Sequence, residues 1–119
     1  MRHAKHRHRI SAGTPGHRRT LMRNLAVEVI DHGKIKTTHA KCQIMRGYVE
    51  KLVTMAKEDS VANRRLALTK LNNRDAVNKL FEQVGPKFKN RPGGYTRILK
   101  LADARLGDGA PMSYLAFVE

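Results

Sequence analysis

The hydrophobic residues of this chain recur at helical spacing in four segments. Apolar side chains three or four positions apart, preceded by a capping residue, are typical of an amphipathic helix. We therefore expect helices over about residues 15–32, 39–57, 61–71 and 74–84. The expected caps and stops are Thr14, Gly33, Thr38, Asp59 or Ser60, Asn73 and Gly85-Pro86. The side chains expected on the buried faces are Leu21, Met22, Leu25, Ala26, Val29, Ile30, Cys42, Met45, Tyr48, Val49, Leu52, Val53, Ala56, Val61, Leu68, Leu71, Val77, Leu80, Phe81 and Val84.

Three shorter segments have the composition of strands. Lys34–Thr38 alternates cations with apolar or hydroxyl side chains. Tyr95–Ala102 and Met112–Val118 each follow a turn, at Arg91–Gly94 and at Gly107–Pro111. We expect these last two strands to pair antiparallel across the loop that joins them. The element order αβαααββ predicts a two-layer α+β fold, in which a small three-stranded sheet is covered by about four helices.

Length and charge narrow the class of protein. The 119 residues fit a single domain, which we place at residues 14–119. Lys and Arg number 24 against 10 Asp and Glu, which gives a net charge of +14. This surplus makes nucleic acid the first candidate partner and an anionic membrane surface the second. Cys42 is the only cysteine, which excludes an internal disulfide, and no apolar run reaches the roughly 18 residues of a membrane span.

Much of the positive charge lies at the amino end. Residues 1–24 carry seven lysines and arginines and four histidines but no carboxylate. Residues 1–13 have only Met1 and Ile10 as large aliphatic side chains, so they cannot build a core, and we interpret them as an extended basic arm. The alternatives are a solvated tail that aids solubility and a mitochondrial presequence, although presequences are usually richer in serine.

Neither a metal site nor a catalytic site is favoured. His3, His6 and His8 have spacings that could ligate a metal, but a closed zinc site needs four ligands and the single Cys42 lies far along the chain. A ribonuclease needs a general acid and a general base, which any basic, histidine-containing chain offers. Phosphate-binding loops, nucleophile elbows and His-Glu-x-x-His motifs do not occur in the sequence. We expect no metal, no cofactor and no enzymatic activity.

The types of cation favour RNA as the partner. Thirteen of the 24 are arginines, whose planar guanidinium grips phosphate with two hydrogen bonds and stacks on exposed bases. The segment Arg91–Arg97 joins two arginines, two glycines and Tyr95, a combination that suits a nucleotide with its base splayed out. The alternative is an ordinary turn with Tyr95 packed in the core. Arg64 and Arg65 are expected to point outward as further candidates, against the simpler interpretation of a solvated helix face.

Several short blocks follow one another along the chain: Met1-Arg-His3, His17-Arg18, Arg23-Asn-Leu25, His32–Thr38, Leu52–Lys57, Ala62–Arg65, Lys79–Phe81, Gly93–Lys100 and Gly107–Met112. Together they resemble the bacterial large-subunit ribosomal protein L17 family over essentially the whole chain. Because the likeness begins at Met1, it also argues against a presequence. Lys41–Ile44 and Ile10–Gly16 depart from the family's pattern, so the resemblance supports contacts there less strongly.

The resemblance implies an integral protein of the large ribosomal subunit in the cytoplasm, bound to 23S rRNA, without catalytic activity or a required cofactor. It also implies a small sheet covered by helices, and neighbouring ribosomal proteins near the exit of the polypeptide tunnel. The rival hypothesis is a free-standing nucleic-acid-binding or chaperone-like factor. The residues expected to contact RNA are Arg2, His3, Lys5, His6, Arg7, Arg9, His17, Arg18, Arg19, Arg23, Asn24, Lys34, Lys36, Thr37, Thr38, Lys41, Arg64, Arg65, Arg91, Gly93, Gly94, Tyr95 and Arg97.

Overall fold

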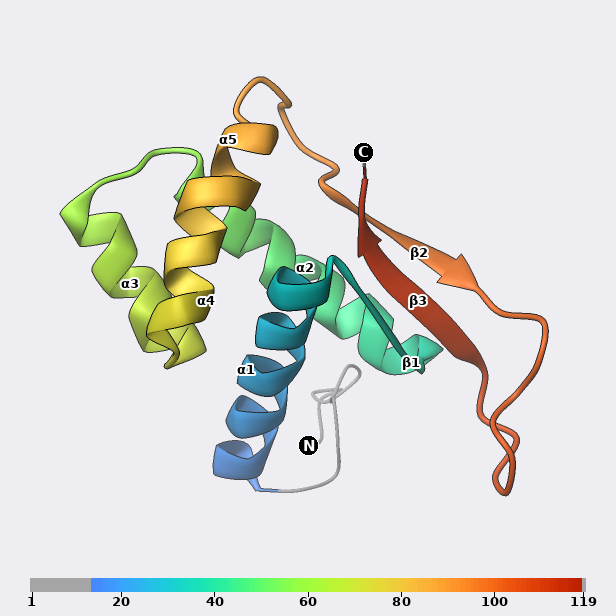
Figure 1. The fold of residues 1–119 in the computed structure, drawn as a ribbon. Coiled ribbons are helices and arrows are strands. Elements are labelled where there is room, and N and C mark those ends of the chain that lie inside the picture. Colours follow the sequence, from blue (N-terminus) through green and yellow to red (C-terminus); the bar gives the residue numbers. More distant parts are fainter. Residues whose placement is uncertain (1–13, 119) are drawn as a thin grey trace, which may run out of the picture.

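The computed structural model describes residues 14–118 and contains the expected elements in the expected order (Figure 1). The elements are α1 (Pro15–His32), β1 (Lys34–Thr38), α2 (His39–Ala56), α3 (Val61–Leu71), α4 (Arg74–Lys79), a π-helical turn η1 (Leu80–Val84), α5 (Gly85–Lys87), β2 (Thr96–Lys100) and β3 (Met112–Phe117). The α+β class is therefore confirmed. The proposed boundary between an arm and a domain coincides with the start of the described residues, so it stays a prediction.

Side-chain caps fix where the helices begin. The hydroxyls of Thr14, Thr38 and Ser60 accept hydrogen bonds from backbone N–H groups in the first turns of α1, α2 and α3. The Asn73 side chain does the same for α4. At the other end of α1, Gly33 takes a left-handed conformation with φ 79° and closes the helix onto the carbonyl of Val29.

The three strands form one antiparallel sheet in the order β1-β3-β2. β2 and β3 pair as expected, and β1 joins the free side of β3. The register aligns Ile35, Leu115 and Ile98 across the sheet, and these side chains belong to the core or pack against it. In Figure 1, α2 runs behind the sheet, so the helical layer covers one sheet face and leaves the other open.

The core lies between the sheet and the helices, and α2 is its centre. All the α2 side chains expected to be buried are buried, apart from the half-buried Tyr48. The expectation for Val61 is wrong, since 67% of this residue is exposed. The reason is that α3 packs through its last two turns, where Ala67 and Leu71 are buried, whereas Val61 in the first turn lines an open surface groove.

The predicted stop at Gly85-Pro86 is also wrong, because the helix continues through η1 and α5 to Lys87. Pro86 lies in α5, which follows η1 without a break because Val84 and Gly85 both keep helical backbone angles. Gly85 passes so close to α2 that a Cβ atom there would lie 2.3 Å from the carbonyl oxygen of Ala56. The glycine therefore permits a close helix contact and does not end the helix.

Candidate RNA interface

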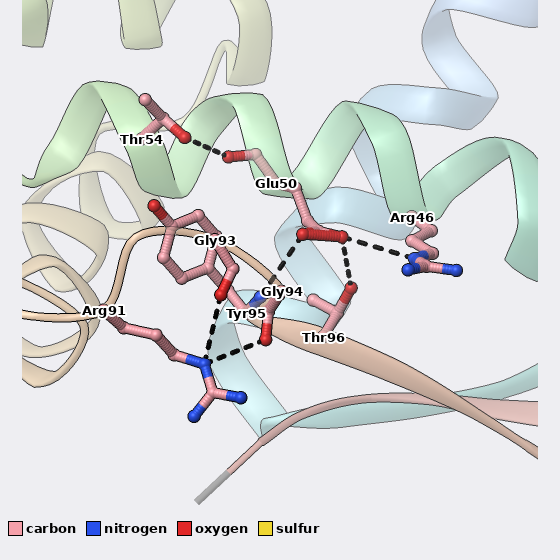
Figure 2. Close-up of polar contacts among 8 residues, drawn as sticks. All are labelled: Arg46, Glu50, Thr54, Arg91, Gly93, Gly94, Tyr95 and Thr96. Carbon is pink, nitrogen blue, oxygen red and sulfur yellow. Dashed lines mark hydrogen bonds and ion pairs between the residues drawn. The ribbon is translucent and has the colours of Figure 1, made fainter.

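The turn that leads into β2 is built around the carboxylate of Glu50 on α2 (Figure 2). Glu50 Oε1 accepts a hydrogen bond from the backbone N–H of Tyr95 at 3.3 Å, and Oε2 accepts one from Thr96 Oγ1 at 3.2 Å. Arg46 Nε, one helical turn earlier, donates to the same carboxylate at 3.3 Å. One half-buried acid thus ties the start of β2 to the helical layer.

Arg91 stabilises the turn from the other side. Its Nε donates to the carbonyl oxygens of Gly93 and Gly94, each at 3.1 Å, and Gly94 has a left-handed φ of 63°. In Figure 2 the terminal guanidinium nitrogens of Arg91 point away from these carbonyls. The residue therefore shapes the turn and still presents donors that suit a phosphate.

Tyr95 does not have the exposed ring that an RNA-stacking residue needs. Only 3% of the residue is exposed, and its ring packs against Phe88 with the centroids 5.4 Å apart. Lys57 Nζ donates to the Tyr95 hydroxyl at 2.9 Å and to the carbonyl of Arg91 at 2.7 Å, and the first of these bonds lowers the pKa of Tyr95. The alternative interpretation of the sequence, a tyrosine packed in the core, is therefore the correct one.

The cations of the sheet have a different setting. Lys34 and Lys36 on β1 and Arg97 on β2 are all exposed, on the sheet face that α2 does not cover. Thr38, at the end of β1, uses its hydroxyl to cap α2 by accepting from the Lys41 N–H at 3.4 Å. The sheet thus gathers three of the predicted cations, whereas Thr38 is occupied by the fold.

The amino-terminal half of α1 contributes a second group. His17, Arg19 and Asn24 are exposed, while Arg23 reaches across to α3 and donates to the carbonyl of Thr69 at 3.3 Å. Arg23 and Asn24 also line a pocket of about 400 Å³ between α1 and the turn that joins α3 to α4. The remaining lining residues are Thr20, Val27, Glu28, Leu71, Asn72 and Asn73, which make the pocket largely polar.

The two arginines of α3 have different roles. Arg64 does not point freely outward, because it donates from Nε and Nη2 to Asp59 at 2.7 and 2.9 Å and its guanidinium lies 5.2 Å from the ring centroid of Phe81. The bond from Arg64 lowers the pKa of Asp59. The Arg65 side chain is exposed and, within residues 14–118, has no hydrogen bond or ion pair. It lines a shallow apolar groove of about 250 Å³ together with Arg74, a cation that was not among the predicted RNA contacts.

Many cations of the described part remain uncommitted. Within residues 14–118, the side chains of the following lysines and arginines have no hydrogen bond, ion pair or aromatic contact: Arg19, Lys36, Lys41, Lys51, Arg65, Lys70, Arg74, Lys89, Arg97 and Lys100. Only a tertiary structure separates these from cations such as Arg64 and Lys57, since the residue types are the same. The sequence does not show which lysines and arginines are exposed beside other cations, and this exposure is what marks a candidate RNA contact.

Several predictions lie outside the described residues. Arg2, His3, Lys5, His6, Arg7 and Arg9 all belong to residues 1–13. Within residues 14–118, no three His, Cys, Asp or Glu side chains gather into a group that could hold a metal ion. None of the helices described over that range combines the length and apolar character needed to cross a membrane.

Most of the chain matches a known protein-family model. Residues 21–118 match the family model described as Ribosomal protein L17. The matched range begins within α1 and includes the remaining helices, the sheet and the turn at Arg91–Gly94.

Proposed function

The chain belongs to the ribosomal protein L17 family, and we propose that 23S rRNA is the partner that holds it in the large subunit. The contacts come from a basic arm, residues 1–13, and from the uncommitted cations of a single domain, residues 14–119. Membership makes the protein a structural, non-enzymatic constituent of the large subunit that functions in translation on the cytoplasmic ribosome. Its partners are accordingly rRNA and other ribosomal proteins.

The observation that carries this proposal is the uncommitted cations on several sides of the molecule. Carboxylates are too few to neutralise the lysines and arginines, and within residues 14–118 Glu50, Asp59 and Asp108 already pair with Arg46, Arg64 and Arg105. The surplus charge therefore needs an external polyanion. A folded RNA meets this need on several faces at once, whereas a membrane surface contacts only one.

In the proposed complex, each part of the protein has its own task. Arg19, Arg65 and Arg97 bind phosphates from three different elements, so they fix the register of the domain on RNA whose three-dimensional shape matches their spacing. Arg23, Arg64 and Arg91 each use at least one donor inside the fold, so they position surface elements and present their remaining donors. The arm adds Arg2, Lys5, Arg7, Arg9 and its histidines to the same polyanion.

Salt dependence of binding to 23S rRNA tests the proposal. If about eight cations contact duplex phosphate, log K falls with log salt at a slope of about −7, or nearer −6 for single strands. Deleting residues 1–13 removes four lysines and arginines, so the slope becomes shallower by about 3 to 4. An unchanged slope after the deletion refutes the arm's role, and failure to bind 23S rRNA at low salt refutes the proposal.

We also propose that the protein neighbours lie near the exit of the polypeptide tunnel. Family membership supports this location. Chemical cross-linking from Lys51 and Lys89 in intact large subunits, read by mass spectrometry, tests it. Cross-links only to proteins remote from the tunnel exit contradict the proposed location. Retention on the subunit after a high-salt wash separates an integral component from a factor that cycles on and off.

A further inference from the structure

The sheet face that α2 leaves open is basic and carries no acid. Side chains alternate between the two faces of a strand, so the neighbours of the inward-facing Ile35, Leu115 and Ile98 point to the open side. The residues of this outer face are Lys34, Lys36, Thr38, Arg97, Leu99, Met112, Tyr114 and Ala116. No aspartate or glutamate occurs among the residues of the three strands.

A tyrosine stands at the centre of this outer face. Tyr114 lies on the middle strand, with Lys36 directly opposite on β1 and Leu99 directly opposite on β2. Opposed side chains in such a sheet have Cβ atoms about 4.5–5.5 Å apart, so Lys36 and Leu99 flank Tyr114 on its two sides. Leu99 is 47% exposed, which is high for a leucine in a strand, and it extends the apolar surface beside the ring.

The next row of the same face supplies charge around a small residue. Ala116 lies between Lys34 and Arg97, and its methyl group leaves space between the two cations. Lys34 Nζ lies 5.2 Å from the ring centroid of Tyr114, so the exposed ammonium already reaches the aromatic ring. With strands about 4.8 Å apart, Lys34 and Arg97 bracket a surface roughly 10 Å wide.

The tyrosine ring, the exposed leucine and the flanking cations of this outer face fit a single unpaired nucleotide better than a duplex or a protein segment. A base stacks on an aromatic side chain through its flat face, and this contact tolerates any base. A duplex keeps its bases inside and offers the ring nothing to stack on. The cations on both flanks, without an acid, complement phosphates and disfavour a basic ribosomal neighbour.

We propose that the outer face of the sheet binds an unpaired nucleotide of rRNA, whose base stacks on Tyr114 beside Leu99. Lys34, Lys36 and Arg97 bind the phosphates on either side of that nucleotide. Lys34 moves from the ring to a phosphate as the base takes its place, which a flexible lysine side chain allows. This inference rests on the proposed function, because it specifies how one surface of the domain engages the rRNA.

Two substitutions of Tyr114 separate stacking from bulk. The full chain and its variants are titrated with 23S rRNA, and folding is checked by circular dichroism and thermal unfolding. Tyr114→Phe keeps the ring and retains affinity within about twofold, whereas Tyr114→Leu lowers affinity about tenfold, within the roughly 5- to 150-fold range of one lost base stack. The salt slope of Tyr114→Leu stays unchanged because no phosphate contact is lost.

A charge substitution and its control complete the test. Lys36→Gln makes the slope of log K against log salt shallower by about 0.7, as expected for one phosphate of a single strand. Lys87→Gln removes the same charge from α5, where the Lys87 ammonium lies 5.3 Å from the ring centroid of Phe88 and is not one of the uncommitted cations, and leaves the slope unchanged. In intact large subunits, ultraviolet irradiation attaches a nucleotide to the peptide that contains Tyr114.

The outcomes distinguish this inference from the function on which it rests. If Tyr114→Leu binds as tightly as the parent chain, or if the Tyr114 peptide is cross-linked to a protein, the nucleotide site is refuted. Loss of affinity on deleting residues 1–13 then still supports rRNA binding through the arm. If the parent chain does not bind 23S rRNA at low salt, the proposed function itself is refuted.

Discussion

Replacing Glu50 by alanine tests whether one acid holds the turn before β2 in place. The substitution removes the acceptor for the N–H of Tyr95 and for the hydroxyl of Thr96, two residues that are 3% and 4% exposed. A buried donor that loses its partner costs about 1–3 kcal/mol. The Glu50 side chain is 22% exposed, so water partly replaces it, and we expect a total loss of about 2–3 kcal/mol in the free energy of unfolding.

Urea denaturation of the full chain measures this loss. With an m-value of about 1.5 kcal/mol/M, the midpoint falls by roughly 1.5 M. Amide hydrogen exchange adds a local measurement, since the Tyr95 N–H loses the Glu50 carboxylate as its acceptor and exchanges faster. Glu50→Gln keeps an acceptor without the charge, so its free energy of unfolding lies between those of the parent chain and Glu50→Ala, about 1 kcal/mol below the parent.

Glu58→Ala is the matched control, because it also removes one negative charge from a strongly basic chain. The Glu58 side chain is exposed and, within residues 14–118, makes no hydrogen bond or ion pair. Its expected effect is within about 0.5 kcal/mol. The reasoning fails if Glu50→Ala and Glu58→Ala shift the midpoint equally, because general charge repulsion then accounts for both.

Contacts elsewhere in the molecule give three other predictions. Gly85→Ala destabilises the fold by about 1–3 kcal/mol, because the added Cβ meets the backbone oxygen of Ala56. Gly47→Ala, which adds a Cβ into open space on the surface of α2, stabilises the fold by about 0.5–1 kcal/mol. Thermal unfolding compares the two variants, and equal effects contradict the close approach of Gly85 to α2. The hydrogen bond from Arg105 lowers the pKa of Asp108. The ionised Asp108 therefore stabilises the fold above its ordinary pKa of about 3.9, and this stabilisation is lost as the pH falls through the lowered value. Arg105→Gln raises the pKa of Asp108 in an NMR titration and removes this pH-dependent part of the stability. Burial raises the pKa of the Cys42 thiol, so thiol reagents at pH 8 modify it only after urea unfolding, and rapid labelling of the folded chain contradicts its buried position.

Some cations of the candidate RNA interface stabilise the fold, while others beside them stay available to a ligand. Lys57 and Arg91 meet at the turn before β2, where they donate to backbone carbonyls and to the Tyr95 hydroxyl. Donors used in this way are no longer available to an external ligand, but they fix the geometry of a surface turn. Neighbouring cations that have no partner within residues 14–118, such as Arg97, are then held at defined positions. Rigid placement of charge is what recognition of RNA shape requires.

Local sequence determined most of the elements of this fold. Caps such as Thr14 and Ser60, and the helical spacing of apolar residues in α2, act over a few positions, so they are visible in the chain itself. The pairing of β2 with β3 was also predictable, because the two strands are joined by one loop. The excess of arginine and lysine over acids was enough by itself to indicate a polyanionic partner.

Tertiary structure decided the points that depend on residues far apart in the chain. The place of β1 beside β3, the burial of Tyr95 under Lys57 and the contact between Gly85 and α2 each join segments more than about 25 residues apart. A glycine after a helical stretch is typical of a helix stop, and a tyrosine in a polar turn is typical of an exposed ring. Only packing reveals that the first admits a neighbouring helix and that the second fills the core. Local patterns fix backbone conformation, whereas burial and free charge follow from which distant surfaces meet.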